Sequence, residues 1–164
     1  MDFKVIDNFL PVDKFNEIKN IVFHEEFPWY VSNSVAYEND NNKDYYFNHF
    51  MWNRASGSCS PFFEKVCSEI LYNIEDIKSI MRIKVNHYPG NEVFREHVMH
   101  KDAPFDHKGA IFSFNTCNGY TKFKDGTKVD SVENRMIFFN PNELHCSTNT
   151  TDEKYRVNLI VNYL

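Results

Sequence analysis

His100 and Asp102 are the residues of this sequence with the clearest capacity for metal chemistry. One residue separates them, and the stretch 93–102 has the pattern of an extended run. Residues i and i+2 of a strand point to the same face of a sheet, so an imidazole and a carboxylate at this spacing can bind one ion from one side. The pair alone is a weak signal, because a solvated histidine beside an aspartate is common.

A third ligand and a separate cation follow later in the chain. His145 lies forty-three residues after Asp102, just after a predicted strand and a turn. Two histidines and one carboxylate on one face leave three coordination positions open, which suits non-haem Fe(II). Arg156 lies eleven residues after His145, inside the last predicted strand. A guanidinium buried there can form a bidentate pair with a carboxylate ligand.

The order of these residues resembles a known protein family. Tyr88-Pro89-Gly90 is followed by His100-x-Asp102, then His145, then Arg156. The segments 86–102 (NHYPGNEVFREHVMHKD) and 134–164 (NRMIFFNPNELHCSTNTTDEKYRVNLIVNYL) resemble 2-oxoglutarate/Fe(II) oxygenases of the prolyl-4-hydroxylase-like group, including the small phage and bacterial forms. The likeness covers about residues 80–164 well and the N-terminal helices loosely.

The resemblance implies an Fe(II)- and 2-oxoglutarate-dependent dioxygenase. Its metal ligands would be His100, Asp102 and His145. 2-Oxoglutarate would bind the iron through its 1-carboxylate and keto oxygen, and O2 would take the last position. Arg156 would hold the distal 5-carboxylate of 2-oxoglutarate, with the Tyr88 hydroxyl as a further contact and Asn158 as a weaker one.

The last predicted strand departs from the nucleic-acid dealkylases of this superfamily. Those proteins carry R-x-N-x-T-x-R, whereas residues 156–162 read RVNLIVN, so the second arginine is missing. The chain has 18 Lys+Arg and 23 Asp+Glu, a formal net charge of −5. This charge argues against a protein held to nucleic acid mainly by phosphate contacts. A prolyl or other residue in a protein or peptide is the preferred substrate, followed by a free amino acid and then another small metabolite.

The predicted elements place a helical region before a strand-rich one. Apolar stripes predict helices at 11–24 and 61–74, the second capped by Ser60. Strands are predicted at 3–6, 81–88, 110–115, 120–124, 127–130, 134–139, 144–149 and 155–163, with a type I′ hairpin at Asp125-Gly126. This order predicts one α+β, mainly β domain over residues 1–164, with a β-sandwich or jelly roll. The resemblance implies a double-stranded β-helix (jelly roll) over about 80–164, with helical support over about 1–79.

The composition is that of an ordinary globular domain. The 164 residues are 42% hydrophobic and 16% aromatic, which suffices for one compact core. The N-terminus has no signal-peptide pattern, no apolar run approaches the ~18 residues of a membrane span, and the cysteines show no disulfide or zinc spacing. We therefore expect a cytoplasmic protein without a membrane partner. The scarcity of Ala and the abundance of Asn and Phe suggest an AT-rich genome, viral or bacterial.

Four other residues are secondary candidates. His97 lies three residues before His100 and would face away from it in an extended strand. His107 could contact the ligands or a substrate. Trp29 and Trp52 could line a substrate groove, although core positions suit aromatic rings better. Two further functions remain open: a non-catalytic jelly-roll module that binds a sugar or a partner protein, and a cupin-like metalloenzyme without a cosubstrate.

Overall fold

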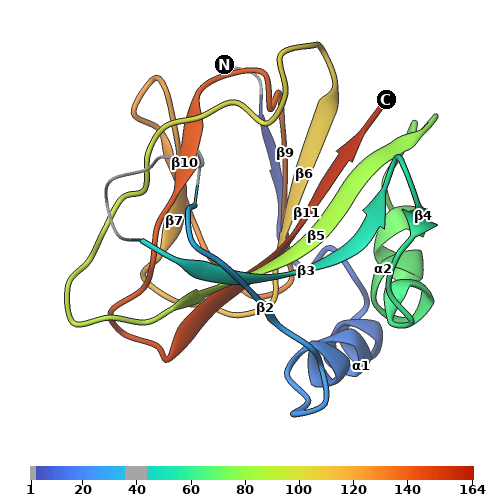
Figure 1. The fold of residues 1–164 in the computed structure, drawn as a ribbon, viewed down its shortest axis with the longest axis horizontal. Helices are drawn as coiled ribbons and strands as arrows, with labels where there is room; N and C mark the ends of the chain where they lie inside the picture. Colours follow the sequence, from blue (N-terminus) through green and yellow to red (C-terminus); the bar gives the residue numbers. More distant parts are fainter. Residues whose placement is uncertain (1–2, 36–43) are drawn as a thin grey trace.

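The computed structural model describes residues 3–35 and 44–164. Within these ranges, two helices cover one side of a large sheet and a small sheet faces its other side (Figure 1). The helices are α1 (Val12–Val22) and α2 (Phe63–Tyr72). The strands are β1 (Lys4–Ile6), β2 (Tyr30–Ser32), β3 (Tyr46–Asn53), β4 (Gly57–Ser58), β5 (Ile80–Pro89), β6 (Lys108–Ser113), β7 (Tyr120–Phe123), β8 (Lys128–Asp130), β9 (Arg135–Phe139), β10 (His145–Ser147) and β11 (Tyr155–Tyr163).

The strand order shows that the chain crosses over between distant elements. The large sheet has the order β1-β9-β6-β11-β5-β3-β2, with β4 paired to β3, and the small sheet has the order β10-β7-β8. The last strand, β11, lies in the middle of the large sheet between β5 and β6, antiparallel to both. Two facing antiparallel sheets with such crossovers form a jelly roll. The predicted fold class is therefore confirmed.

The main core lies between the helices and the outer face of the large sheet. Each helix buries one apolar stripe: Phe15, Ile18 and Val22 in α1, and Val66, Cys67 and Ile70 in α2. These stripes belong to the same buried cluster as Val157, Leu159 and Val161 of β11. Because side chains alternate across a strand, the residues between them face the small sheet. None of the helices in the described ranges is long and apolar enough to cross a membrane.

A smaller apolar cluster joins the two sheets. Its buried members are Ile111, Phe123, Val129, Ile137 and Phe139. They come from β6 and β9 of the large sheet and from β7 and β8 of the small sheet. Beside this cluster, the space between the sheets is lined mainly by polar side chains, which come from β5, from β10 and from the segment 100–102.

The expected division near residue 80 does not divide the sheet. The first 79 residues carry both helices, but they also carry β1 to β4, which belong to the large sheet. Strand β3 pairs with β5 from Phe47↔His87 to Asn53↔Arg82. The N-terminal region therefore completes the sheet as well as supporting it.

Three local predictions were wrong in detail. The run 93–102 is not a strand, because within it only Glu96 and His100 form isolated bridges, to Thr148 and His145. The second helix begins at Phe63, and the Ser60 hydroxyl accepts the Phe62 N–H (3.0 Å) in the preceding turn. The Asp125-Gly126 turn is not type I′, because Gly126 has a φ of 88° and Asp125 has a negative φ. This pattern matches a three-residue hairpin loop closed by a glycine bulge.

Candidate metal centre

Backbone pairing holds His100 beside His145. The His100 N–H donates to the His145 carbonyl oxygen (2.9 Å), and the His145 N–H donates back (3.0 Å). The two ring centroids lie 4.7 Å apart. Two residues further on, the Asp102 N–H donates to the carbonyl oxygen of Pro141 (3.0 Å). The segment 100–102 is thus tied to the chain around β10 by three backbone hydrogen bonds.

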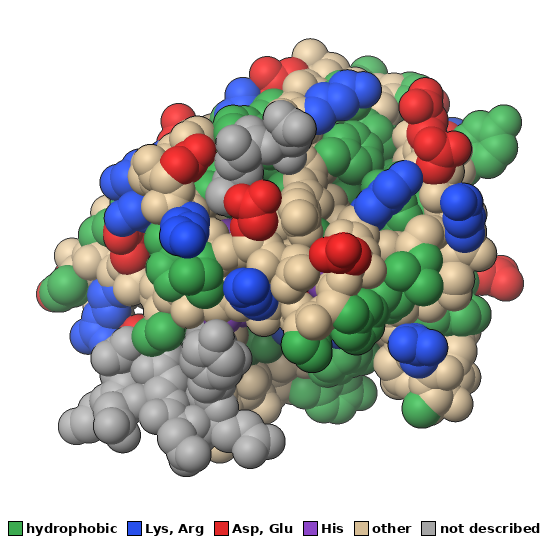
Figure 2. All heavy atoms as spheres, turned by 90° about the horizontal axis from the view of Figure 1, so that it is seen from above, with side chains coloured by type: hydrophobic (Ala, Val, Ile, Leu, Met, Phe, Trp, Pro, Cys, Tyr) green, Lys and Arg blue, Asp and Glu red, His purple; other side chains and the backbone are tan. Residues whose placement is uncertain are grey.

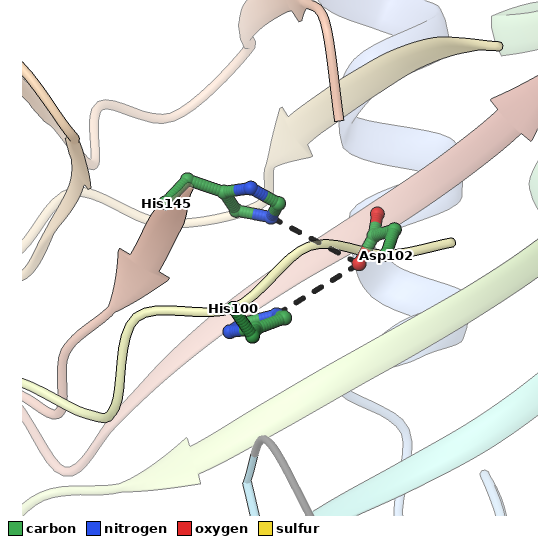
Figure 3. Close-up of side chains that lie close together, drawn as sticks. All are labelled: His100, Asp102 and His145. Atoms are coloured by element: carbon green, nitrogen blue, oxygen red, sulfur yellow. Dashed lines mark ion pairs between the residues drawn. The ribbon is translucent and has the colours of Figure 1, made fainter. Parts of the chain in front are cut away.

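The three predicted ligands converge on one point (Figure 3). Oδ1 of Asp102 lies 3.8 Å from Nε2 of His100 and 3.9 Å from Nε2 of His145. One candidate ligand atom from each residue lies within 4.8 Å of the other two. A single ion with bonds of about 2.0–2.2 Å fits this spacing.

Backbone carbonyls orient both imidazoles. Nδ1 of His145 lies 2.9 Å from the Glu143 carbonyl oxygen, and Nδ1 of His100 lies 3.1 Å from the Val98 carbonyl oxygen. A carbonyl oxygen can only accept, so Nδ1 carries the hydrogen in each ring. Nε2 then carries the lone pair that a metal ion takes.

The Asp102 carboxylate is buried but well supported. Its Oδ2 accepts a hydrogen bond from Asn162 Nδ2 (2.9 Å), and its Oδ1 lies 3.2 Å from Arg82 Nη2. Burial raises the pKa of Asp102, but the charge of Arg82 and the Asn162 hydrogen bond act against it, and this pKa lies below its usual value. Asp102 is therefore an anion that turns Oδ1 toward the histidines.

The candidate ligands lie in a cavity of about 260 Å³ between the two sheets. Four of its lining side chains alternate along β5: Arg82, Lys84, Asn86 and Tyr88. Strands β10 and β11 contribute His145, Cys146, Ser147, Asn158 and Ile160. The volume suits a small organic molecule, and the lining is largely polar.

Arg156 is a buried cation close to this cavity. It is 1% exposed, with Nη1 donating to the Thr148 carbonyl oxygen (3.2 Å) and Nη2 to the Thr121 hydroxyl (3.1 Å). Among the described residues, its Nε has no hydrogen-bond partner and no carboxylate lies within 4.0 Å of the guanidinium. A Cβ on Gly119 would come within 2.6 Å of Arg156 Cδ, so glycine leaves room for this side chain. Burial lowers the pKa of Arg156, because it disfavours the charged guanidinium. An anionic partner would stabilise that charged form.

Tyr88 and Asn158 lie along the same inner face. Tyr88 is opposite Arg156 in the β5–β11 register, and the guanidinium carbon lies 5.7 Å from its ring centroid. Burial raises the pKa of Tyr88 to about 12, so its hydroxyl stays protonated and can donate. Asn158 accepts a hydrogen bond from Asn86 Nδ2 (3.3 Å). Both candidates line the cavity.

Solved structures of other proteins are similar to this chain, and three of them illustrate the likeness. The prolyl hydroxylase from Trichoplax adhaerens, in complex with a hypoxia inducible factor oxygen degradation domain peptide fragment, has a TM-score of 0.68 at 15% identity, covering 99% of this chain and 83% of that chain. The viral collagen prolyl hydroxylase from Paramecium Bursaria Chlorella virus-1, as a 2OG complex, has a TM-score of 0.65 at 13% identity, with 99% and 96% coverage. A 2OG-Fe(II) oxygenase family oxidoreductase from Burkholderia pseudomallei has a TM-score of 0.67 at 11% identity, with 98% and 84% coverage.

The chain has the prolyl hydroxylase fold. The resemblance predicted from the sequence is confirmed at the level of the fold. No protein-family model matches the sequence, and no curated protein matches it either. Low sequence identity over nearly the whole chain means that the likeness lies in the arrangement of strands and helices.

The secondary candidates occupy other places in this hydroxylase fold. Trp29 and Trp52 pack against the main core under the helices. His97 Nδ1 lies 2.9 Å from the Ser147 hydroxyl oxygen. His107 is buried, and its Nε2 lies 3.3 Å from Nδ2 of Asn162, the residue that also holds Asp102. None of these four side chains lines the cavity within the described part of the chain.

Sequence reasoning missed several residues of the site. Arg82 and Asn162 were not candidates, yet they hold Asp102, and Arg82 Nε donates to Asn162 Oδ1 (3.0 Å). Lys84 and Asn86 were also missed, although both line the cavity. The available signal was the alternation over 81–88, which puts these β5 residues on the face shared with Tyr88.

Proposed function

We propose that this protein is an Fe(II)- and 2-oxoglutarate-dependent dioxygenase that hydroxylates a C–H bond of its substrate. The observation that carries this proposal is the convergence of His100, Asp102 and His145 near a buried Arg156 that has no carboxylate partner among the described residues. The iron, when bound, would supply the oxidation chemistry. One atom of O2 enters the substrate as a hydroxyl, and the other enters succinate as 2-oxoglutarate loses CO2.

The donor set suits Fe(II). Two neutral imidazole nitrogens and one carboxylate oxygen lie on one side of the site, which leaves room for further ligands. Asn162 occupies the second oxygen of Asp102, so the carboxylate would bind the metal through one oxygen. Arg82 and Asn162 would act as positioning residues that keep this oxygen facing the histidines.

The distance between the candidate metal centre and Arg156 suits a five-carbon diacid. His145 and Ser147 are two residues apart on β10, and Ser147 pairs with Thr121, which contacts Arg156. Two residues of a strand span about 7 Å. Arg156, with its unpaired Nε, would bind the distal carboxylate of 2-oxoglutarate, and the Tyr88 hydroxyl would add a second donor.

The preferred substrate is a prolyl or other residue of a protein or peptide, followed by a free amino acid. Support comes from similar structures that are prolyl hydroxylases, one of them bound to a peptide. Nucleic acid is less well supported. On the face drawn in Figure 2, Lys and Arg side chains alternate with Asp and Glu and form no continuous basic stripe among the described residues.

The test combines binding with turnover. Calorimetry under anaerobic conditions should show one Mn(II) per chain, and then 2-oxoglutarate binding that depends on the metal. With Fe(II) and O2, the protein should release succinate from 2-oxoglutarate, faster with a suitable peptide or amino acid. Metal binding without 2-oxoglutarate binding would favour the cupin-like alternative. Absence of both would favour the non-catalytic module.

A further inference from the structure

The cavity is richer in positive charge than the rest of the molecule. Its charged lining residues among those described are Arg82, Lys84, Lys101 and Asp102, although the whole chain has a net charge of −5. The charge of Arg82 is already balanced by its ion pair with Asp102. Two cations remain: Lys84, which is partly buried, and Lys101, which is exposed to solvent. The cavity thus favours an anion in addition to Asp102.

Lys84 forms no ion pair with an acidic side chain in the described part of the chain. Its Nζ donates to the Tyr46 hydroxyl oxygen (2.8 Å) and lies 5.0 Å from the Tyr46 ring centroid. No carboxylate of the described residues lies within 4.0 Å of this nitrogen. An ammonium group has three hydrogens, so two remain for a ligand, and the Tyr46 hydroxyl keeps its own hydrogen to donate. Burial lowers the pKa of Lys84, a cost that an anionic ligand would offset.

Lys84 lies at the metal end of the cavity and not at the Arg156 end. In the β5–β11 register, Tyr88 is opposite Arg156, whereas Lys84 is opposite Ile160. Four residues of a strand span about 13 Å. The neighbouring inward side chain on the other side, Arg82, contacts Asp102 directly. An anion at Lys84 is therefore distinct from the distal carboxylate of 2-oxoglutarate at Arg156.

We infer that the substrate carries a carboxylate, which Lys84 and the Tyr46 hydroxyl bind beside the metal centre. This inference rests on the proposed oxygenase function and names its substrate class. Even with one Fe(II) and one doubly charged 2-oxoglutarate bound, the described residues that line the cavity leave an excess of positive charge. The carboxylate can come from the backbone of a free amino acid or from an acidic side chain next to the oxidised residue in a peptide.

The test uses matched acids and amides as probes. The protein is loaded with Mn(II) and 2-oxoglutarate, and its thermal stability is measured against L-amino acids and their carboxamides. A second series compares the acetylated tripeptide amides Glu-Pro-Gly and Gln-Pro-Gly. An acid should bind about tenfold to a hundredfold more tightly than its amide, because a hydrogen bond to a charged group is lost in the amide. The series that responds identifies the source of the carboxylate.

Variants separate Lys84 from the rest of the site. Lys84→Met should abolish the preference for acids and leave the affinities for Mn(II) and 2-oxoglutarate unchanged. Lys84→Arg should retain much of the preference, and Tyr46→Phe should reduce it less than Lys84→Met does. Lys65→Met is the matched control, because Lys65 is exposed on α2, and it should change nothing.

Three results would overturn the inference. The first is equal binding of acids and amides, or no response to either, by the loaded wild-type protein. The second is a preference for acids that persists in Lys84→Met. The third is a loss of 2-oxoglutarate affinity in that variant, which would place Lys84 in the cosubstrate site. Failure of the proposed function is distinguishable, because it would appear before any probe is added, as absence of Mn(II) or 2-oxoglutarate binding to the wild type.

Discussion

The two faces of β11 have opposite compositions on one continuous strand. Toward the helices it presents Val157, Leu159, Val161 and Tyr163, all in the main core. Toward the small sheet it presents Arg156, Asn158, Ile160 and Asn162. The polar members of this second face are nearly as buried as the apolar ones, at 1% exposed for Arg156 and 2% for Asn158 and Asn162. Burying polar groups costs stability unless they gain partners. The outer face therefore stabilises the fold, and we propose that the inner face binds ligands.

The largest expected effect comes from a change at the cavity. His145→Ala should lower metal affinity by more than about a hundredfold. Changes to residues that only hydrogen-bond to metal ligands already lower metal affinity by about 10–100-fold. Iron-dependent turnover should be lost while the circular dichroism spectrum stays native. His24→Ala is the control, because His24 is exposed just beyond α1. Turnover that survives in His145→Ala would show that the ligand assignment is wrong.

The second prediction concerns the other end of the cavity. Arg156→Met should weaken 2-oxoglutarate binding by about 2–5 kcal/mol, because a buried charged pair is lost. Mn(II) affinity should hardly change, which calorimetry of metal and cosubstrate can separate. Arg135→Met is a matched control, since Arg135 at the start of β9 pairs with Asp7 just after β1, outside the cavity. Unchanged 2-oxoglutarate affinity in Arg156→Met would exclude the proposed role.

The third prediction concerns the outer face. Leu159→Ala should destabilise the protein by about 2–5 kcal/mol, because Leu159 is fully buried and its truncation leaves a cavity. Urea denaturation measures this loss. At low temperature, where the variant is folded, Mn(II) and 2-oxoglutarate affinities should match those of the wild type. A large loss of ligand affinity with little change in stability would contradict the separation of the two faces.

The smallest effect is expected at Asn158. Asn158→Ala removes the hydrogen bond with Asn86 and a weak contact to the cosubstrate. The lost contact is worth about 1 kcal/mol. The 2-oxoglutarate concentration needed for half-maximal turnover should therefore rise roughly fivefold. Titration of succinate release against 2-oxoglutarate gives this value. A loss as large as that of Arg156→Met would make Asn158 a principal ligand of the cosubstrate.

The sequence predicted β11 to the residue, because it is a long strand with strong alternation that follows the polar stretch 149–154. It failed for 93–102, where the chain runs beside β10 through isolated bridges. Strand geometry predicted that the side chains of His100 and Asp102 point to the same side. In the structure they do so from irregular backbone, which hydrogen bonds to His145 and Pro141 hold in place. Tertiary hydrogen bonds of this kind have no local sequence signal.

The residues that support the site were harder to predict than the candidate ligands. His100, Asp102 and His145 stand out by residue type and order. Arg82 and Asn162 act through an ion pair and a hydrogen bond to Asp102, formed between residues 20 and 60 positions apart. Such pairs depend on the register of β5 against β11, which alternation alone does not define.

In the proposed oxygenase, one metal ion binds to three side chains while 2-oxoglutarate reaches Arg156. An anaerobic crystal structure with Fe(II) and 2-oxoglutarate, using anomalous scattering from iron, tests it most directly. We expect one anomalous peak about 2.0–2.2 Å from Nε2 of His100, Nε2 of His145 and Oδ1 of Asp102, with the distal carboxylate on the Arg156 guanidinium. An iron peak elsewhere, or 2-oxoglutarate bound away from Arg156, would contradict it.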